Sequence, residues 1–148
     1  MKEKEALFQH LRTIQLKYSR LYTHILSQAD LSLPQYALLN QLDSSGPLPM
    51  TEISGRLHIS KPAVTNLVDR LEKKKFLKRT PHPRDRRIYL LELSPKGKTI
   101  ARKIQNYVLA FLFKTFDQFS VKERKTVQRF YACLSEIMDE ALQTSHSK

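Results

Sequence analysis

The sequence predicts a mainly α-helical protein (α+β) that contains a single small β-hairpin. Over most of the 148 residues apolar side chains recur every three to four positions, and the chain holds only three glycines, as in amphipathic helices. The pattern changes after Lys75. Two short apolar and aromatic segments, FLKRT and IYLLEL, flank the stretch PHPRDRR, which is typical of two strands joined by a loop.

Helical periodicity is clearest in the N-terminal part of the chain, from Glu5 to about Ser27. Ser32 then fits the N-cap of a second helix, with Pro34 in its first turn. The stretch DSSGPLP, residues 43–49, predicts a turn or loop. The apolar positions of the first helix share one face: Leu7, Leu11, Ile14, Tyr18, Leu21, Tyr22 and Ile25.

Two helices are expected before the hairpin. Thr51 is suited to cap a short helix, EISGRL, and Ser60 to cap a helix that begins KPAVTNLVDRLEKKK. The two are separated only by the connector HIS. Two closely spaced helices of this kind are typical of a helix-turn-helix.

Two long helices are expected after the hairpin. Ser94 and Pro95 mark the start of the first, which continues to about Phe116. Ser120 and Glu123 fit a capping box for the second. The chain therefore divides into a middle segment with its own small core, residues 31–93, between helical segments 1–30 and 94–148.

The flanking helices predict a homodimer. Each is apolar along one stripe, yet a chain of this length offers these stripes little partner surface of its own. Two copies that pack the stripes of segments 1–30 and 94–148 together would cover them, with two-fold symmetry as the default. Cys133, in the last helix, is expected to be a small buried apolar residue.

The charge of the chain predicts a polyanionic partner. The formal net charge is +12, and residues 51–100 carry thirteen Lys or Arg against five Asp or Glu, a net +8. Residues 73–87 alone hold eight bases and one acid. A charge run is often only a solvated surface, but clustering in one compact segment favours a binding surface for nucleic acid. A membrane-surface role is disfavoured, because the run has few apolar anchors.

The expected cellular compartment is inferred from the lack of a membrane span, a signal core and a disulfide in the sequence. No apolar run approaches the roughly 18 residues of a membrane-spanning helix, and the first residues mix acids and bases without an apolar signal core. The single cysteine excludes an internal disulfide. We expect a cytoplasmic protein.

The helix that follows Ser60 has two contrasting faces. Val64, Leu67, Val68 and Leu71 share one face, which is expected to lie in the core. On the other face Asn, Arg and Thr side chains are suited to contact adenine, guanine and the thymine methyl group in a major groove. The positive hairpin would bind phosphates and a narrow minor groove. The exposed face holds Pro62, Thr65, Asn66, Asp69, Arg70 and Lys73.

These segments resemble the MarR family of winged helix-turn-helix regulators. The matching stretches are LSLPQYALLNQL, MTEISGRLHIS, AVTNLVDRLEKKKFLKR, PRDRRIYLLELSPKGK and FSVKERKTVQRFYACLSEI. The resemblance covers residues 31–137 and is most specific in the pairing of VTNLVDRLE with a downstream DRR. It implies a winged helix-turn-helix domain, a homodimer, a palindromic DNA site and repression that a ligand or oxidant relieves.

The resemblance also implies roles for individual residues. Asp69 would pair with a wing arginine, Arg87, and anchor the wing together with Asp85. His58 and Lys75 stand where the family often has glycine, so a left-handed backbone is expected at both. The DNA-binding set would be Ser60, Lys61, Pro62, Thr65, Asn66, Arg70 and Lys73, with Arg84, Arg86 and Arg87 at the wing tip.

The effector is less well defined by the sequence. The five histidines are scattered, so no metal site is expected, and no cofactor is implied. A small aromatic or lipophilic effector is the common case in the family. Tyr18, Tyr22 and Tyr36 could line its pocket, although a core or interface role is the favoured explanation for each of these tyrosines.

The sequence also bears on two alternatives to a regulator, an enzyme and an architectural DNA-binding protein. An enzyme is disfavoured, because the sequence has no glycine-rich phosphate loop, nucleophile–base pair or paired carboxylates. A non-specific architectural DNA-binding protein would also be basic. It would have no need for Thr65, Asn66 and Arg70 on an exposed face, and this favours a sequence-specific regulator, most simply a repressor.

Overall fold

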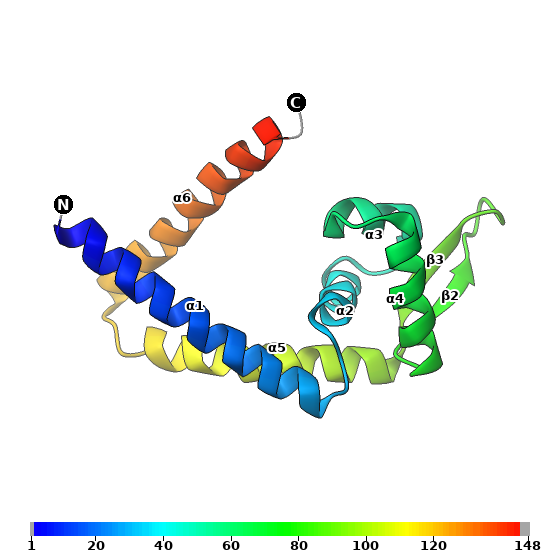
Figure 1. Cartoon of the computed structure of the whole chain (residues 1–148), viewed down its shortest axis with the longest axis horizontal. Coiled ribbons are helices and arrows are strands. Elements are labelled where there is room, and N and C mark those ends of the chain that lie inside the picture. Colours follow the sequence, from blue (N-terminus) through cyan, green and yellow to red (C-terminus); the bar gives the residue numbers. More distant parts are fainter. Residues whose placement is uncertain (1, 146–148) are drawn as a thin grey trace. The chain divides into compact units, whose positions relative to one another are not determined.

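The computed structural model of the chain describes residues 2–145 and confirms the predicted fold class (Figure 1). Helices predominate, and three short strands form one small sheet: β1 precedes the helix-turn-helix, and the hairpin β2–β3 follows it in the winged-helix arrangement. In chain order the elements are α1 (Lys2–Gln28), α2 (Leu33–Ser45), β1 (Leu48–Pro49), α3 (Met50–Leu57), α4 (Lys61–Lys73), β2 (Leu77–Pro81), β3 (Tyr89–Leu93), α5 (Pro95–Phe116) and α6 (Val121–Ser145).

The chain separates into two compact units, Met1–Val108 and Leu109–Lys148. The first unit holds every element up to the first part of α5, and the second holds the rest of α5 with α6. The boundary lies inside a helix, whereas the sequence suggested segments 1–30, 31–93 and 94–148. That finer division stays a prediction.

The core of the first unit combines one face of each short helix with the sheet. Leu38 and Leu39 of α2, Ile53 of α3 and Leu91 of β3 are completely buried. Ile104 of α5 is also completely buried, which brings the first part of α5 into the same core. The helix-turn-helix is therefore built on one continuous apolar core.

The predicted hairpin is present, and a third strand joins it. Strand β2 pairs antiparallel with β3 in a register that sets Arg79 opposite Leu91. On the other edge of β3, Leu48 of β1 also pairs with Leu91. The sequence predicted a turn or loop over residues 43–49, which is wrong for residues 43–45, the end of α2, and for Leu48–Pro49. A two-residue strand is too short to show periodicity, and it exists because β3 supplies its partner.

The helix caps follow the sequence predictions with one exception. Ser32 caps α2 in a reciprocal box with Gln35, and Ser60 caps α4. Ser120 forms the predicted box with Glu123, and the hydrogen bonds from Ser120 lower the pKa of the Glu123 carboxyl. The prediction for Thr51 is wrong: α3 begins at Met50 without a side-chain cap, because β1 runs directly into the helix.

Among residues 2–145, three non-glycine residues adopt a left-handed backbone: Asp30, His58 and Lys75, with φ of 52°, 51° and 61°. The expectation for His58 and Lys75 is confirmed. Each follows a helix and reverses the chain at its C-terminal end, the position that glycine favours. Asp30 also reverses the chain, after α1, although a left-handed backbone was not predicted at this position.

Large apolar side chains remain exposed on the long helices. In the first unit α1 exposes Leu7 and Leu11, and in the second α6 exposes Leu134 and Ile137, the latter to 58%. Cys133 is exposed as well, so the prediction of a buried thiol is wrong for the single chain. The apolar pattern that suggested burial belongs to a helix face that the described part of the chain leaves open.

Candidate nucleic-acid interface

The turn between α3 and α4 is held by its own hydrogen bonds. The Ser54 hydroxyl donates to the carbonyl of Ile59 at 2.7 Å, and the Ile59 amide donates back to the Ser54 carbonyl at 3.3 Å. His58 supplies the left-handed residue between them. The connector is therefore rigid, and it sets α4 at a defined angle to α3, as a helix-turn-helix requires.

Helix α4 turns one face to the core and the other to solvent. Val64, Val68 and Leu71 are buried, and Leu67 is half-buried, as predicted. The Thr65 hydroxyl donates to the Lys61 carbonyl at 3.1 Å, so it is engaged within the helix. The predicted DNA-facing residues Ser60, Lys61, Pro62, Thr65, Asn66, Arg70 and Lys73 are all exposed, as is Asp69.

An ion-pair cluster joins the hairpin to α4. Arg79 of β2 contacts both Asp69 and Glu72 of α4 through its guanidinium. Partial burial works against its charge, but the hydrogen bond to Asp69 and the charges of Glu72 and Asp69 outweigh it and raise the pKa of Arg79. The wing strand is thereby fastened to the exposed helix.

The predicted partner of Asp69 was Arg87, and this prediction is wrong. Arg87 lies in the loop at the far end of the hairpin, whereas β2 runs beside α4 and presents Arg79 to it. The sequence did carry a signal for Arg79. It lies two positions after the buried Leu77, on the same side of the strand, where a cation needs acidic partners.

The tip of the hairpin is ordered by Asp85. Its carboxylate accepts a hydrogen bond from the Arg87 amide at 2.9 Å, and its carbonyl accepts one from the Ile88 amide at 3.0 Å. The Arg84 amide donates to Nδ1 of His82 at 3.2 Å. The side chains of Arg84, Arg86 and Arg87 are exposed on this tip, so a compact turn holds three cations in solvent.

The eight bases of residues 73–87 fall into two groups. Lys74 pairs with Asp30, Lys78 with Glu92 at 3.3 Å, and Arg79 with the acids of α4. The other five have no ion pair within residues 2–145: Lys73, Lys75, Arg84, Arg86 and Arg87. The unneutralised charge of the run thus lies at the end of α4 and at the hairpin tip.

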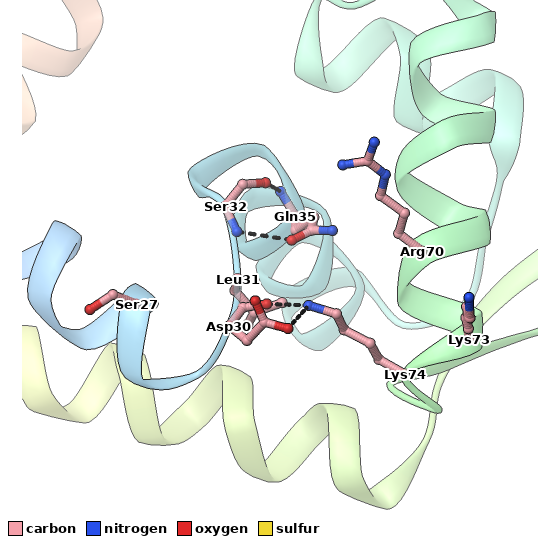
Figure 2. A pocket seen from close by; sticks show the side chains of 8 residues that line it. All are labelled: Ser27, Asp30, Leu31, Ser32, Gln35, Arg70, Lys73 and Lys74. Atoms are coloured by element: carbon pink, nitrogen blue, oxygen red, sulfur yellow. Dashed lines mark hydrogen bonds and ion pairs between the residues drawn. The ribbon is translucent and has the colours of Figure 1, made fainter.

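A basic hollow of about 880 Å³ lies beside α4 (Figure 2). Figure 2 shows the Arg70 guanidinium extending from α4 toward the first turn of α2, where Ser32 and Gln35 form their capping box. Lys74 and Asp30 pair at another edge of the hollow. The lining residues are Ser27, Asp30, Leu31, Ser32, Gln35, Arg70, Lys73 and Lys74.

The three tyrosines proposed for an effector pocket lie in different environments. Tyr22 lines a smaller cavity of about 460 Å³ on α1, and its ring centre is 5.9 Å from that of Tyr36. Tyr36 is buried, and this burial, followed by the influence of Tyr22, raises its pKa to about 12. Tyr18 is half-buried and, like Tyr36, lines neither cavity.

The described part of the chain holds neither a metal-binding cluster nor a membrane-spanning helix. Among residues 2–145, no group of three or more His, Cys, Asp or Glu side chains is gathered closely enough to hold a metal ion. Within the same part of the chain no helix combines the length and the apolar character needed to span a membrane.

Comparison with known proteins identifies the family. The MarR family model matches residues 31–89, which contain the helix-turn-helix and most of the hairpin. An HTH-type transcriptional regulator of Bacillus subtilis, YfiV, is 30% identical over 112 residues, covering 76% of this chain and 70% of YfiV. The chain belongs to the MarR family. It is thus a DNA-binding transcriptional regulator and not an enzyme.

Solved structures of MarR-type regulators have the same fold. The YusO protein of Bacillus subtilis aligns with a TM-score of 0.75 at 22% identity, over 91% of this chain and 96% of YusO. A variant of Staphylococcus aureus MepR, bound to an oligodeoxyribonucleotide, aligns with a TM-score of 0.67 at 22% identity. That alignment covers 90% of this chain and 97% of MepR.

Proposed function

We propose that this MarR-family protein binds a palindromic operator as a homodimer and represses transcription there. The observation that carries the proposal is the pairing of two cationic features in one unit. These are the exposed face of α4, and a hairpin whose strand β2 is fastened to α4 by an ion-pair cluster and whose tip carries three arginines without an ion pair in residues 2–145. The oligodeoxyribonucleotide bound to the structurally similar MepR supports a DNA ligand.

Base readout is assigned to the middle of α4. Asn66 is exposed and has no hydrogen-bond partner within residues 2–145, so both its amide donor and its acceptor are available to a base edge. Thr65 and Arg70 lie beside it on the same face. Ser60 and Lys61, at the N-terminus of the helix, are placed for a phosphate, which the free backbone amides there also attract.

The wing arginines are assigned to the DNA backbone and minor groove. Arg84, Arg86 and Arg87 project from a turn that Asp85 orders, so little backbone entropy is lost when they bind. Phosphates would neutralise the mutual repulsion of these cations and release condensed counterions. This would explain why a chain keeps so many like charges close together.

Homodimerisation is assigned to the open apolar faces of the long helices. The exposed apolar residues of α1 and α6 are spaced as helix faces, and such contiguous apolar surface usually marks a protein interface. A second copy that packs against these faces would cover them and place two copies of α4 on a two-fold operator. Because its ligand is DNA, the protein would act in the cytoplasm.

Relief of repression by a small aromatic or lipophilic ligand completes the proposal. The smaller cavity, with Tyr22, Leu26 and Leu31 in its lining, has the more apolar walls and suits such a ligand. The basic hollow is lined by Arg70, which is also assigned to DNA. A ligand in either cavity would lie close to the elements that hold or form the DNA-binding surface.

Replacement of Asn66 by alanine is expected to lower sequence preference. Loss of one bidentate base contact costs roughly 1–3 kcal/mol for the operator and much less for unrelated DNA. Fluorescence anisotropy with operator and scrambled duplexes measures both affinities. Asn106→Ala, which removes an exposed asparagine from α5, serves as the matched control. An unchanged ratio of the two affinities would rule out base readout by Asn66.

Replacement of Arg86 by alanine is expected to weaken binding to all duplexes and to flatten the salt dependence. One lost phosphate contact lowers the slope of log affinity against log salt by about 1. Lys103→Ala on α5 removes the same charge away from the wing and controls for net charge. Equal slopes for the two variants would mean that the wing tip does not contact DNA.

The proposed function is tested by selection of binding sites from randomised duplexes, followed by anisotropy at several salt concentrations. We expect an inverted repeat to be enriched and to bind ~10³-fold or more tightly than a scrambled duplex. Failure to enrich any sequence, together with equal affinity for all duplexes and a steep salt slope, would contradict the proposal. That result would identify a non-specific architectural DNA-binding protein.

A further inference from the structure

One lysine of the basic run turns away from the DNA-binding surface. The Lys74 ammonium donates to the Asp30 carboxylate at 2.8 Å and also to the Asp30 backbone carbonyl. Lys74 is the C-cap residue of α4, and Asp30 is the left-handed residue that ends α1. The contact therefore joins the end of the DNA-reading helix to the end of the N-terminal helix.

The geometry of the two helix ends gives this contact a physical reason. The Leu31 amide donates to the Leu26 carbonyl at the end of α1, and the Phe76 amide donates to the Leu71 carbonyl at the end of α4. Both helices thus end in the same type of reversed turn, and each end carries partial negative charge. A single ammonium group between them offsets the repulsion of the two helix ends.

The start of α5 is fastened to the same place. The Lys96 ammonium donates to the Lys74 carbonyl at 3.1 Å and lies 4.8 Å from the centre of the Phe76 ring. The Ser94 hydroxyl donates to the Lys75 carbonyl at 2.7 Å. The C-terminal end of α4 is therefore held from two sides, by the turn after α1 and by the first turn of α5.

The contact between Lys74 and Asp30 contributes little to the stability of the fold. The Asp30 side chain is 94% exposed, and exposed ion pairs contribute little to folding. DNA binding does not account for it either, since Lys74 is only 29% exposed and its ammonium is already engaged. The hydrogen bond from Lys74, together with its charge, lowers the pKa of the Asp30 carboxyl, so this carboxylate stays ionised at neutral pH and is protonated only in acid.

We infer that Asp30 and Lys74 are positioning residues that set the direction of α4 relative to α1, and thereby the half-site spacing that a dimer accepts. This inference rests on the proposed function, in which exposed apolar residues of α1 pack against a second copy. An operator one base pair longer displaces a half-site by ~3.4 Å and rotates it by ~35°. A reading helix whose C-terminal end is held by the turn after α1 and by the start of α5 would reject that displacement, and one released from α1 would tolerate it better.

The test compares charge-changing variants on operators of different spacing. Lys74→Gln removes a positive charge and Asp30→Asn removes a negative one, so electrostatics alone predicts opposite changes in overall DNA affinity. The inference predicts that both variants lose spacing selectivity in the same direction. Asn tolerates the left-handed backbone at position 30, and Lys78→Gln, which breaks the exposed pair with Glu92, is the matched control.

The readout is the ratio of affinities for the selected operator and for operators one base pair longer or shorter, measured by anisotropy. We expect Lys74→Gln and Asp30→Asn each to lower this ratio roughly two- to fivefold, and Lys74→Arg to keep it near the wild-type value. Affinity for a single half-site should change no more in Lys74→Gln than in Lys78→Gln.

Ratios that match the control in both variants, or that move in opposite directions, would overturn the inference. A different result would contradict the proposed function: the wild-type chain would show no preference for an inverted repeat over a single half-site. In that case the positioning role fails with it. Size-exclusion chromatography and thermal unfolding of each variant show whether a change in the affinity ratio arises because the variant no longer dimerises or no longer folds.

Discussion

Aspartate at both Leu134 and Ile137 is expected to leave the chain monomeric and to abolish its preference for a palindromic duplex. Both side chains lie on the exposed apolar face of α6. In a dimer each replacement would bury an unpaired carboxylate, which costs several kcal/mol, and two-fold symmetry doubles the number of such sites. Analytical ultracentrifugation at micromolar concentration measures the oligomeric state directly.

The same variant should lose most of its operator affinity. In a dimer, binding of one DNA-binding domain raises the effective concentration of the other at its half-site, which increases operator affinity ~10²–10⁴-fold. A monomer lacks this increase. Gln128→Asp with Ser135→Asp adds the same charge to other exposed positions of α6 and should remain dimeric. A Leu134→Asp, Ile137→Asp variant that stays dimeric would show that the interface lies elsewhere.

Alanine in place of Gly97 is expected to destabilise the protein. A β-carbon at this position would lie 1.8 Å from the Phe76 carbonyl oxygen and 2.8 Å from its carbon. Both are backbone atoms at the junction of α4 and β2, so they cannot rotate away as a side-chain end would. We expect a loss of about 1–3 kcal/mol or more in the free energy of unfolding, and a melting temperature lower by about 2–4 °C for each kcal/mol.

Gly55→Ala supplies a control with the opposite sign. Gly55 lies in α3, and a β-carbon there would meet no atom within 4 Å. Since alanine is the better helix former by about 1 kcal/mol, this variant should be slightly more stable than the wild type. A Gly97→Ala variant that melts at or above the wild-type temperature would mean that α5 is not packed tightly against Phe76.

Several features of this protein could be predicted because they depend on neighbours in sequence. The caps at Ser32, Ser60 and Ser120 satisfy amides two or three residues away, so the local pattern is sufficient to find them. The core face of α4 follows from helical spacing, and the left-handed His58 and Lys75 follow from the chain reversal after each helix. The exposure of Asn66 and Arg70 is the complement of that core face.

Contacts between residues far apart in the sequence could not be predicted in the same way. Strand β1 exists only because β3 lies beside it, and Asp69 meets Arg79 rather than Arg87 because the strand, not the loop, runs next to α4. Cys133 is exposed although it lies among apolar residues in the sequence, because helical spacing does not tell whether a helix face meets another surface.

The sequence by itself thus determined the helices, the hairpin, the exposed residues of α4 and the excess of positive charge. Only the tertiary structure decided how that charge is used. It neutralises Lys74, Lys78 and Arg79 with acids from the turn after α1, from β3 and from α4, and within residues 2–145 it leaves the arginines of the wing tip without an ion pair. The physical reason is that Coulombic pairing depends on distance in space, which the packing of helices on the sheet establishes.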